Sequence, residues 1–258
     1  MIRKATREDI PAIEALYDEI HTREEAGEVT TGWIRGVYPV RETAEAAVER
    51  DDMFVQKDQD GNIIGTGILN QIQVDVYGEG SWRYPAKDDQ VMVIHTLVIS
   101  GRVKGKGWGN EFLRFYEDYA RDHGCPYLRL DTNARNRAAR AFYKSHGYHE
   151  VGSVPTVFNG IPGVDLVLIE KKIDLGSKLY QLMVRKGYPR DFAALIAQEM
   201  HTEFTENRMI GYIARSGLLP PEEVADEMLA ILSDRDRIRD KHILEHAQQS
   251  INEMYRKQ

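Results

Sequence analysis

The stretch VKGKGWGNEFLRFYEDYA, residues 103–120, places three glycines at the start of a helix. Its apolar residues keep helical spacing from Trp108 through Phe112 to Tyr119. The β-branched segment DQVMVIHTLVIS, residues 89–100, precedes it and predicts a central strand. A glycine turn between a strand and a helix offers free backbone N–H groups at the positive end of the helix dipole. The stretch therefore predicts a phosphate-binding turn in an α/β fold.

Spacing excludes two common nucleotide-binding motifs. A P-loop needs G-x-x-x-x-G-K-[ST], but Gly107 follows the Gly105-Lys106 pair and Ser100 stands at the position of the first glycine. A dinucleotide fingerprint needs G-x-G-x-x-G, and its third glycine is replaced by Asn110 or Phe112, depending on the frame. The turn must serve another kind of phosphate ligand.

A second motif lies in DTNARNRAARAFYKSHGY, residues 131–148. It completes the pattern N-x-x-A-x-x-[FL]-Y-x-x-x-G-[FY], with Asn136, Ala139, Phe142, Tyr143, Gly147 and Tyr148. Together with the strand step Leu97-Val98-Ile99 and Lys104-x-x-Gly107-x-Gly109, it resembles the GNAT superfamily of acetyl-CoA-dependent N-acyltransferases. A lysine replaces the family's usual glutamine or arginine at position 104. The resemblance covers roughly residues 1–173.

The resemblance implies an α/β fold, a mixed sheet of about seven strands flanked by helices. From about Asp174 the sequence pattern becomes helical only, and one helix is expected over DFAALIAQEMHTEFTENRMIGYIARSG, residues 191–217. We therefore expect a transferase domain over residues 1–173 and a small all-α domain of unknown role over residues 174–258.

The resemblance further implies acetyl-CoA as co-substrate and no metal. The backbone of Leu97, Val98 and Ile99 would pair with the pantetheine arm, and a backbone N–H near Val98 or Ile99 would stabilise the oxyanion. The amides of the turn would hold the pyrophosphate, and Asn136 and Tyr143 would contact the cofactor. The turn residues concerned are Lys104, Gly105, Lys106, Gly107, Trp108, Gly109 and Asn110.

Two side chains are candidates for proton transfer. Tyr143 would protonate the leaving thiolate, because a phenol with a pKa of about 10 keeps its proton at neutral pH. His95 would accept the ammonium proton, and strict strand alternation predicts that it shares a face with Leu97 and Ile99. The alternatives are a core tyrosine, and an inert buried histidine with ordered water as the base.

Three aromatic residues are candidates for the acceptor site. By the resemblance Trp33 and Tyr38 fall between the first two helices, and Tyr77 precedes the histidine strand. Such residues would build an aromatic pocket for a small primary amine, although aromatic loop anchors have the same sequence pattern.

Composition limits the function classes. The net charge of -7 disfavours a nucleic-acid binder, and the single cysteine excludes a thiolate metal cage. His242 and His246 lie four residues apart on an expected helix, but the H-E-x-x-H motif is absent. Without a signal peptide or an apolar span, a cytoplasmic protein without membrane partners is expected. A homodimer is one of the arrangements that would bury the apolar stripes of the tail.

These observations predict an N-acetyltransferase that moves an acetyl group from acetyl-CoA to a small primary amine by direct transfer in a ternary complex. Two alternatives stay open. One is a catalytically silent acyl-CoA-binding module with a helical partner-binding domain. The other is a transferase acting on protein N-termini or lysines.

Overall fold

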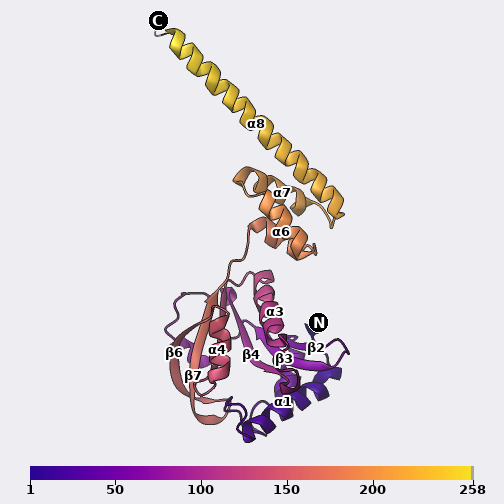
Figure 1. The fold of residues 1–258 in the computed structure, drawn as a ribbon, viewed down its shortest axis with the longest axis vertical. Helices are drawn as coiled ribbons and strands as arrows, with labels where there is room; N and C mark the ends of the chain where they lie inside the picture. Colours follow the sequence, from indigo (N-terminus) through magenta and orange to yellow (C-terminus); the bar gives the residue numbers. More distant parts are fainter. Residues whose placement is uncertain (257–258) are drawn as a thin grey trace. The chain divides into compact units, whose positions relative to one another are not determined.

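The computed structural model describes the backbone of residues 1–256 and the side chains of residues 1–241. His242 and His246 thus lie outside the described side chains. The chain forms two compact units, Met1–Asp174 and Leu175–Gln258. The first contains a seven-stranded sheet in the order β1-β2-β3-β4-β5-β7-β6 (Figure 1). Its strands are β1 (Ile2–Lys4), β2 (Met53–Lys57), β3 (Ile63–Asn70), β4 (Val91–Ile99), β5 (Tyr127–Asn133), β6 (His149–Phe158) and β7 (Ile161–Lys172).

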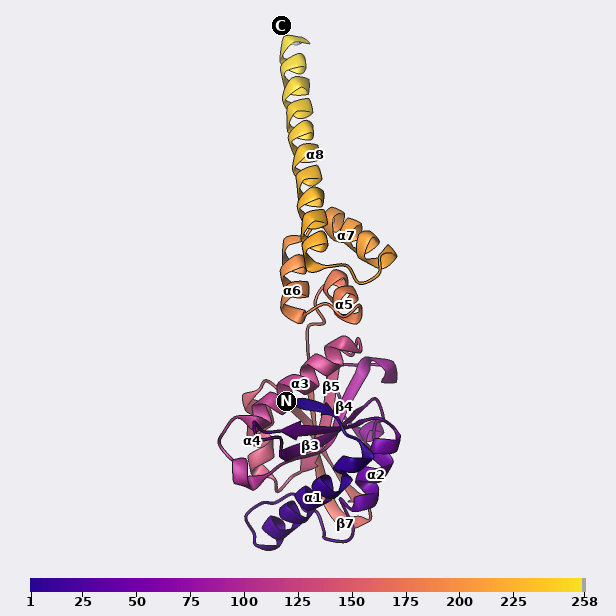
Figure 2. The same cartoon turned by 90° about the vertical axis from the view of Figure 1, so that its right-hand side faces the viewer.

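Helices cover both faces of this sheet (Figure 2). They are α1 (Ile10–Glu25), α2 (Arg41–Glu49), α3 (Trp108–Asp122) and α4 (Arg137–Ser145). Phe112 and Tyr116 of α3 are fully buried against one face, in the same cluster as Met92 and Ile94. The buried side chains of α1 and α2 pack on the opposite face, around Val98. The expected mixed sheet flanked by helices is confirmed.

Strand β4 departs from its neighbour after three paired residues. It pairs in parallel with β5 only from Val91 to Val93, opposite Tyr127 to Arg129. On its other side the register with β3 shifts between Thr66 and Ile68. The two central strands therefore diverge, and the edge of β4 that faces β5 has no strand partner from Ile94 onward among the described residues.

The register shift coincides with a left-handed residue. Thr96 has φ of 51°, a conformation that β-branched residues rarely adopt. Leu97 and Ile99 consequently pack in the same cluster as Ile94. The prediction that His95 shares a face with Leu97 and Ile99 is wrong, because strict alternation holds only without a bulge.

The segment between β3 and β4 covers the part of the sheet that α1 and α2 leave open. It contains two short 3-10 helices, Asp75–Glu79 and Asp88–Gln90. Arg129 of β5 is 5% exposed and fastens the segment, because it donates to Gln73 Oε1 (2.6 Å) and to the Tyr84 carbonyl (3.0 Å). Its guanidinium also lies 4.1 Å from the ring centroid of Trp82. We call residues 71–90 the covering segment.

The second unit is helical over its described residues. It consists of α5 (Lys178–Arg185), α6 (Arg190–Glu199), α7 (Glu203–Arg215) and α8 (Pro221–Arg256), around its own buried apolar cluster. The helix expected over residues 191–217 is two helices. Thr202 Oγ1 accepts from the Thr205 amide (3.2 Å), an N-cap that starts α7 and separates it from α6. No helix within the described part of either unit is long and apolar enough to cross a membrane.

Candidate active site

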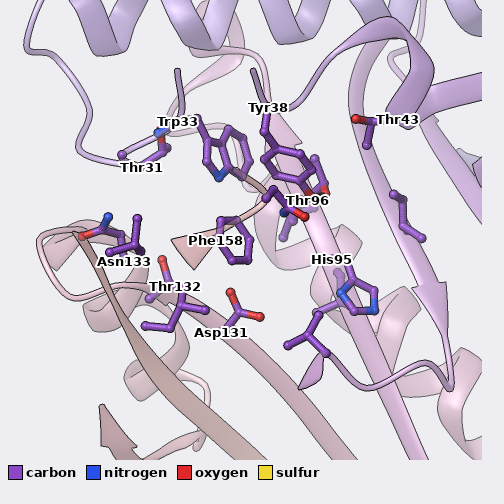
Figure 3. A pocket seen from close by; sticks show the side chains of 18 of the residues that line it. Thr31, Trp33, Tyr38, Thr43, His95, Thr96, Asp131, Thr132, Asn133 and Phe158 are labelled. Atoms are coloured by element: carbon purple, nitrogen blue, oxygen red, sulfur yellow. Dashed lines mark hydrogen bonds between the residues drawn. The ribbon is translucent and has the colours of Figure 1, made fainter. Parts of the chain in front are cut away.

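A cavity of about 370 Å³ opens where β4 and β5 diverge, within the first unit. Its walls come from the segment between α1 and α2, from β3, β4 and β5, from α4 and from the β6–β7 hairpin (Figure 3). Six sequence-predicted residues line it: Trp33, Tyr38, His95, Leu97, Asn136 and Tyr143. Cavities of this size hold small ligands. The strand edge predicted to hold the acetyl donor and the residues predicted to hold the acceptor therefore line the same cavity.

The glycine turn lies outside this cavity and precedes α3. Gly105 and Gly107 have φ of +79° and +83°, and a Cβ on either would meet nothing within 4 Å. The turn thus needs glycine for its backbone shape and leaves open space beside it. The Lys104 and Lys106 amides donate weakly to Gly101 and Val103 carbonyls (3.2 and 3.4 Å). The first-turn amides of α3, from Trp108 to Asn110, have no partner within the helix, so they are the donors available to an anion.

Glu19 of α1 holds the entry to that turn. Its carboxylate accepts from Ser100 Oγ (2.8 Å) and from the Gly101 amide (2.6 Å). These bonds fix the chain between β4 and the glycine turn. A cofactor with a pyrophosphate and an extended arm fits this arrangement: the α3 amides and the unpaired edge of β4, Leu97 to Ile99, would hold it.

Tyr143 projects from α4 into the cavity. Asn136 caps that helix, because its Oδ1 accepts from the Ala139 amide (3.1 Å). The Tyr143 side chain is 7% exposed, and burial, with a smaller effect of the charge on Asp131, raises the pKa of its phenol well above the usual value. The phenol is therefore fully protonated at neutral pH, as a proton donor must be.

His95 is held as a neutral ring. Its Nε2 lies 3.1 Å from both Asn70 Oδ1 and the Ile72 carbonyl oxygen. Because Asn70 Nδ2 donates to Asp52 Oδ2 (2.8 Å), both groups facing Nε2 are acceptors, so Nε2 carries the hydrogen. Burial lowers the pKa of His95 to about 4. The ring is a weak base at neutral pH.

Asp131 is an acidic residue in the cavity that the sequence reasoning missed. It lies near the end of β5, and Tyr77 donates to its Oδ2 (2.8 Å). Burial raises the pKa of this carboxyl to about 6, against a smaller lowering by the Tyr77 hydrogen bond. Its negative charge also raises the pKa values of Tyr38 and Tyr143.

Three aromatic rings form one wall of the cavity. Trp33 and Tyr38 are edge-to-face with centroids 5.8 Å apart, and Tyr38 and Phe158 likewise at 5.5 Å. The Tyr38 hydroxyl also shares a hydrogen bond with Thr96 Oγ1. Tyr77 is not among the lining residues, since it is 3% exposed and its side chain packs from the covering segment against the sheet. It contacts two residues that line the cavity, Asp131 through its hydroxyl and Val74 through its backbone amide.

Two of the missed residues differ in how they could have been found. Asp131 follows the strand YLRL and precedes Asn136 by five residues. An acidic residue at the end of a buried strand, close to a predicted site residue, could have been predicted to belong to the site. Phe158 belongs to the β6–β7 hairpin, far along the chain from Tyr38, and nothing local indicates that the two rings meet.

Comparison with known proteins assigns the chain to a family. The model of the acetyltransferase (GNAT) family matches residues 13–148. The chain therefore belongs to the GNAT acetyltransferase family. The second unit lies outside the matched residues.

Individual relatives agree with this assignment. A Bacillus subtilis protein described as an uncharacterized N-acetyltransferase, YhfO, is 33% identical over 61 residues, which are 24% of this chain and 41% of that protein. The chain thus spans about two fifths of that curated relative. A GNAT acetyltransferase structure from Streptococcus agalactiae has a TM-score of 0.57 at 24% identity, covering 67% of this chain and 95% of that one. The Salmonella typhimurium protein yncA, a putative acetyltransferase solved with its cofactor acetyl-CoA, has a TM-score of 0.50 at 18% identity over 67% of this chain and 94% of that one.

Proposed function

We propose that the first unit transfers an acetyl group from acetyl-CoA to a primary amine of a small molecule, directly within a ternary complex. The observation that carries this proposal is the shared cavity: Leu97 and Tyr143 line it together with Trp33 and Tyr38. A donor lying along the β4 edge would thus present its thioester to an amine on the aromatic side. The related structure that contains acetyl-CoA supports this choice of donor.

The residues of the chain supply three parts of the chemistry. The unpaired backbone edge of β4 beyond Ile94 provides N–H donors for the pantetheine arm and for the oxyanion. As the nitrogen–carbon bond forms and the carbon–sulfur bond breaks, Tyr143 gives its proton to the sulfur. Because Cys125 is buried in the turn before β5, away from the cavity, no covalent acetyl-cysteine step is proposed.

Two alternatives make different predictions. A silent acyl-CoA-binding module would bind the cofactor without turnover. A protein acetyltransferase would need room for a polypeptide beside the acceptor position. The contact between Tyr38 and Phe158 joins two separate segments at one wall of the cavity, which favours a small acceptor.

Cofactor binding is tested first by thermal shift with acetyl-CoA, CoA and ATP. A ligand that binds only the folded state adds about 2.7 kcal/mol at 100 times its dissociation constant. We expect acetyl-CoA and CoA to raise the melting temperature and ATP to leave it nearly unchanged. An equal shift with all three ligands, or none with acetyl-CoA, contradicts the donor assignment.

Turnover is tested next by following CoA release with primary amines and with peptides bearing a free N-terminus or a lysine. We expect release with at least one small amine and an acetylated product of the matching mass. Release with peptides alone would support the protein acetyltransferase, and binding without release would support the silent module.

A further inference from the structure

The acceptor side of the cavity combines one carboxylate with a wall of aromatic rings. Asp131 provides the carboxylate, and Trp33, Tyr38 and Phe158 provide the rings (Figure 3). The rings come from the segment between α1 and α2 and from the β6–β7 hairpin. These two segments lie against each other, because a Cβ built on Gly160 would be only 3.7 Å from Val37 Cγ1. An ammonium group is attracted both to a carboxylate and to the faces of aromatic rings.

The cavity offers little to a negatively charged acceptor. Among its lining residues within the described part of the chain, Arg50 is the only lysine or arginine. Arg50 is paired with Asp52, its Nε 2.9 Å from Oδ2. The same Asp52 also accepts from Asn70, so this pair belongs to the network that orients His95. A carboxylate on the acceptor would therefore approach Asp131 without a free cation beside it.

Aliphatic side chains lie among the residues that line the cavity. Ile72 and Val74 of the covering segment, and Val164 and Leu166 of β7, complete the acceptor side. Apolar surface of this kind favours a hydrocarbon or aromatic body, since removing it from water lowers the free energy. Uncharged polar side chains, among them Thr31, Thr132 and Asn133, also line the cavity and are available to orient the body.

We propose that the acceptor is a primary amine with an apolar, preferably aromatic, body and no carboxylate near its nitrogen, and that Asp131 binds its ammonium group. In the reaction Asp131 also takes one proton from the ammonium group, which frees the lone pair that attacks the acetyl carbon. The second proton lost from the nitrogen goes to Tyr143, after its phenol has protonated the departing sulfur. Tyr77 of the covering segment is a positioning residue, since its hydroxyl donates to the Asp131 carboxylate (2.8 Å) and fixes it. This inference rests on the proposed acetyl transfer and specifies its acceptor.

Three matched acceptors test the charge requirement: 2-phenylethylamine, phenylalanine and phenylalaninamide. Phenylalanine adds a carboxylate, and phenylalaninamide adds a group of similar size without the charge. We expect kcat/KM for phenylalanine to be about tenfold or more below that for phenylalaninamide, because like charges repel at short range. An equal or higher value for phenylalanine overturns the proposal.

Two variants test the residues. Asp131→Asn keeps the size of the side chain and its acceptor oxygen for Tyr77, so we expect a higher KM for 2-phenylethylamine and a smaller penalty for phenylalanine. Phe158→Ala should raise KM for 2-phenylethylamine but not for ethylamine. Val157→Ala, at a neighbouring side chain that is 65% exposed, is the control and should change neither. If Asp131→Asn leaves the ratio of kcat/KM between phenylalaninamide and phenylalanine unchanged, Asp131 does not discriminate between acceptors by their charge.

Binding measurements separate this inference from the proposed function. Calorimetric titration of the three amines into the full chain saturated with CoA requires no turnover. Tighter binding of phenylalaninamide than of phenylalanine without acetylation would keep the acceptor site and refute the transferase. Acetylation with a preference for phenylalanine would support the transferase and refute the proposed acceptor.

Discussion

At the scale of single residues, Tyr143 has the clearest consequence. Phenylalanine at this position keeps the ring in the cavity and removes the donated proton. We expect Tyr143→Phe to lower kcat by about 10²- to 10⁴-fold with a small change in KM for acetyl-CoA. Steady-state kinetics measure this.

Tyr148→Phe is the matched control, because Tyr148 is also buried in the same cluster but donates to Glu117 (3.2 Å) rather than lining the cavity. Its kcat should stay close to that of the unaltered chain. An unchanged kcat in Tyr143→Phe would show that solvent supplies the proton.

The pH dependence distinguishes Asp131 from His95 as the proton acceptor. Asp131 must be ionised to accept a proton. As the pH drops below about 6, kcat/KM should therefore fall about tenfold per pH unit, the dependence of a single ionisation. His95, with a pKa of about 4, would place that limb near pH 4. The profile of Asp131→Asn should lack the limb at pH 6. A limb that persists in this variant would assign it to another group.

The same carboxyl should lower stability at neutral pH. Its pKa is raised to about 6 in the folded chain from 3.8, so the folded state holds the proton more tightly than the unfolded state. The free energy of unfolding then decreases as the pH rises from about 4 to about 6, by an amount on the order of 2–3 kcal/mol, and stays lower above it. In denaturant unfolding, the free energy of unfolding of Asp131→Asn should exceed that of the unaltered chain at pH 7. This difference should disappear at pH 4. Equal differences at both values would contradict the raised pKa.

At the scale of elements, the covering segment depends on a buried cation. Arg129 fastens it with two charge-assisted hydrogen bonds and a contact with Trp82. We expect Arg129→Met to destabilise the chain by about 2–4 kcal/mol and to open residues 71–90 to proteases. Since this segment carries Tyr77 and Ile72, the acceptor KM should rise as well.

Lys87→Met is the control for that experiment, because Lys87 is exposed on the same segment. It should leave both the protease pattern and the melting temperature unchanged. Cleavage within residues 71–90 at equal rates in both variants would refute the fastening role of Arg129.

Sequence patterns predicted the elements better than their local irregularities. The pattern from Asn136 to Tyr148 is local, and it correctly assigned the family. The bulge at Thr96 left no sequence signal, because a threonine in a β-branched run is an ordinary strand residue. Two contacts of the site depend on the order of strands in the sheet, which no local sequence pattern predicts. They are the ring contact of Tyr38 with Phe158 and the hydrogen bond of Tyr77 with Asp131.

At the scale of the whole molecule, each unit has its own core. The buried clusters of the sheet unit and that of the helical unit share no residue. We propose that residues 1–174 form the complete catalytic domain. A chain ending at Asp174 should fold, bind acetyl-CoA with the thermal shift of the full chain and keep its turnover. Calorimetry of the full chain should show two transitions, of which acetyl-CoA moves one. Loss of turnover in the shortened chain, with its thermal shift intact, would show that the helical unit contributes to catalysis.

The buried Cys125 makes this chain a convenient starting point for chemical labelling. It is the only cysteine, it is fully buried, and burial raises the pKa of its thiol to about 11. Maleimides react with thiolates, so the native chain should take up little dye under gentle conditions. One cysteine introduced on an exposed site of each unit would then carry a fluorophore pair without any background substitution. Energy transfer between the two dyes would report directly on how acetyl-CoA and an amine change the distance between the units.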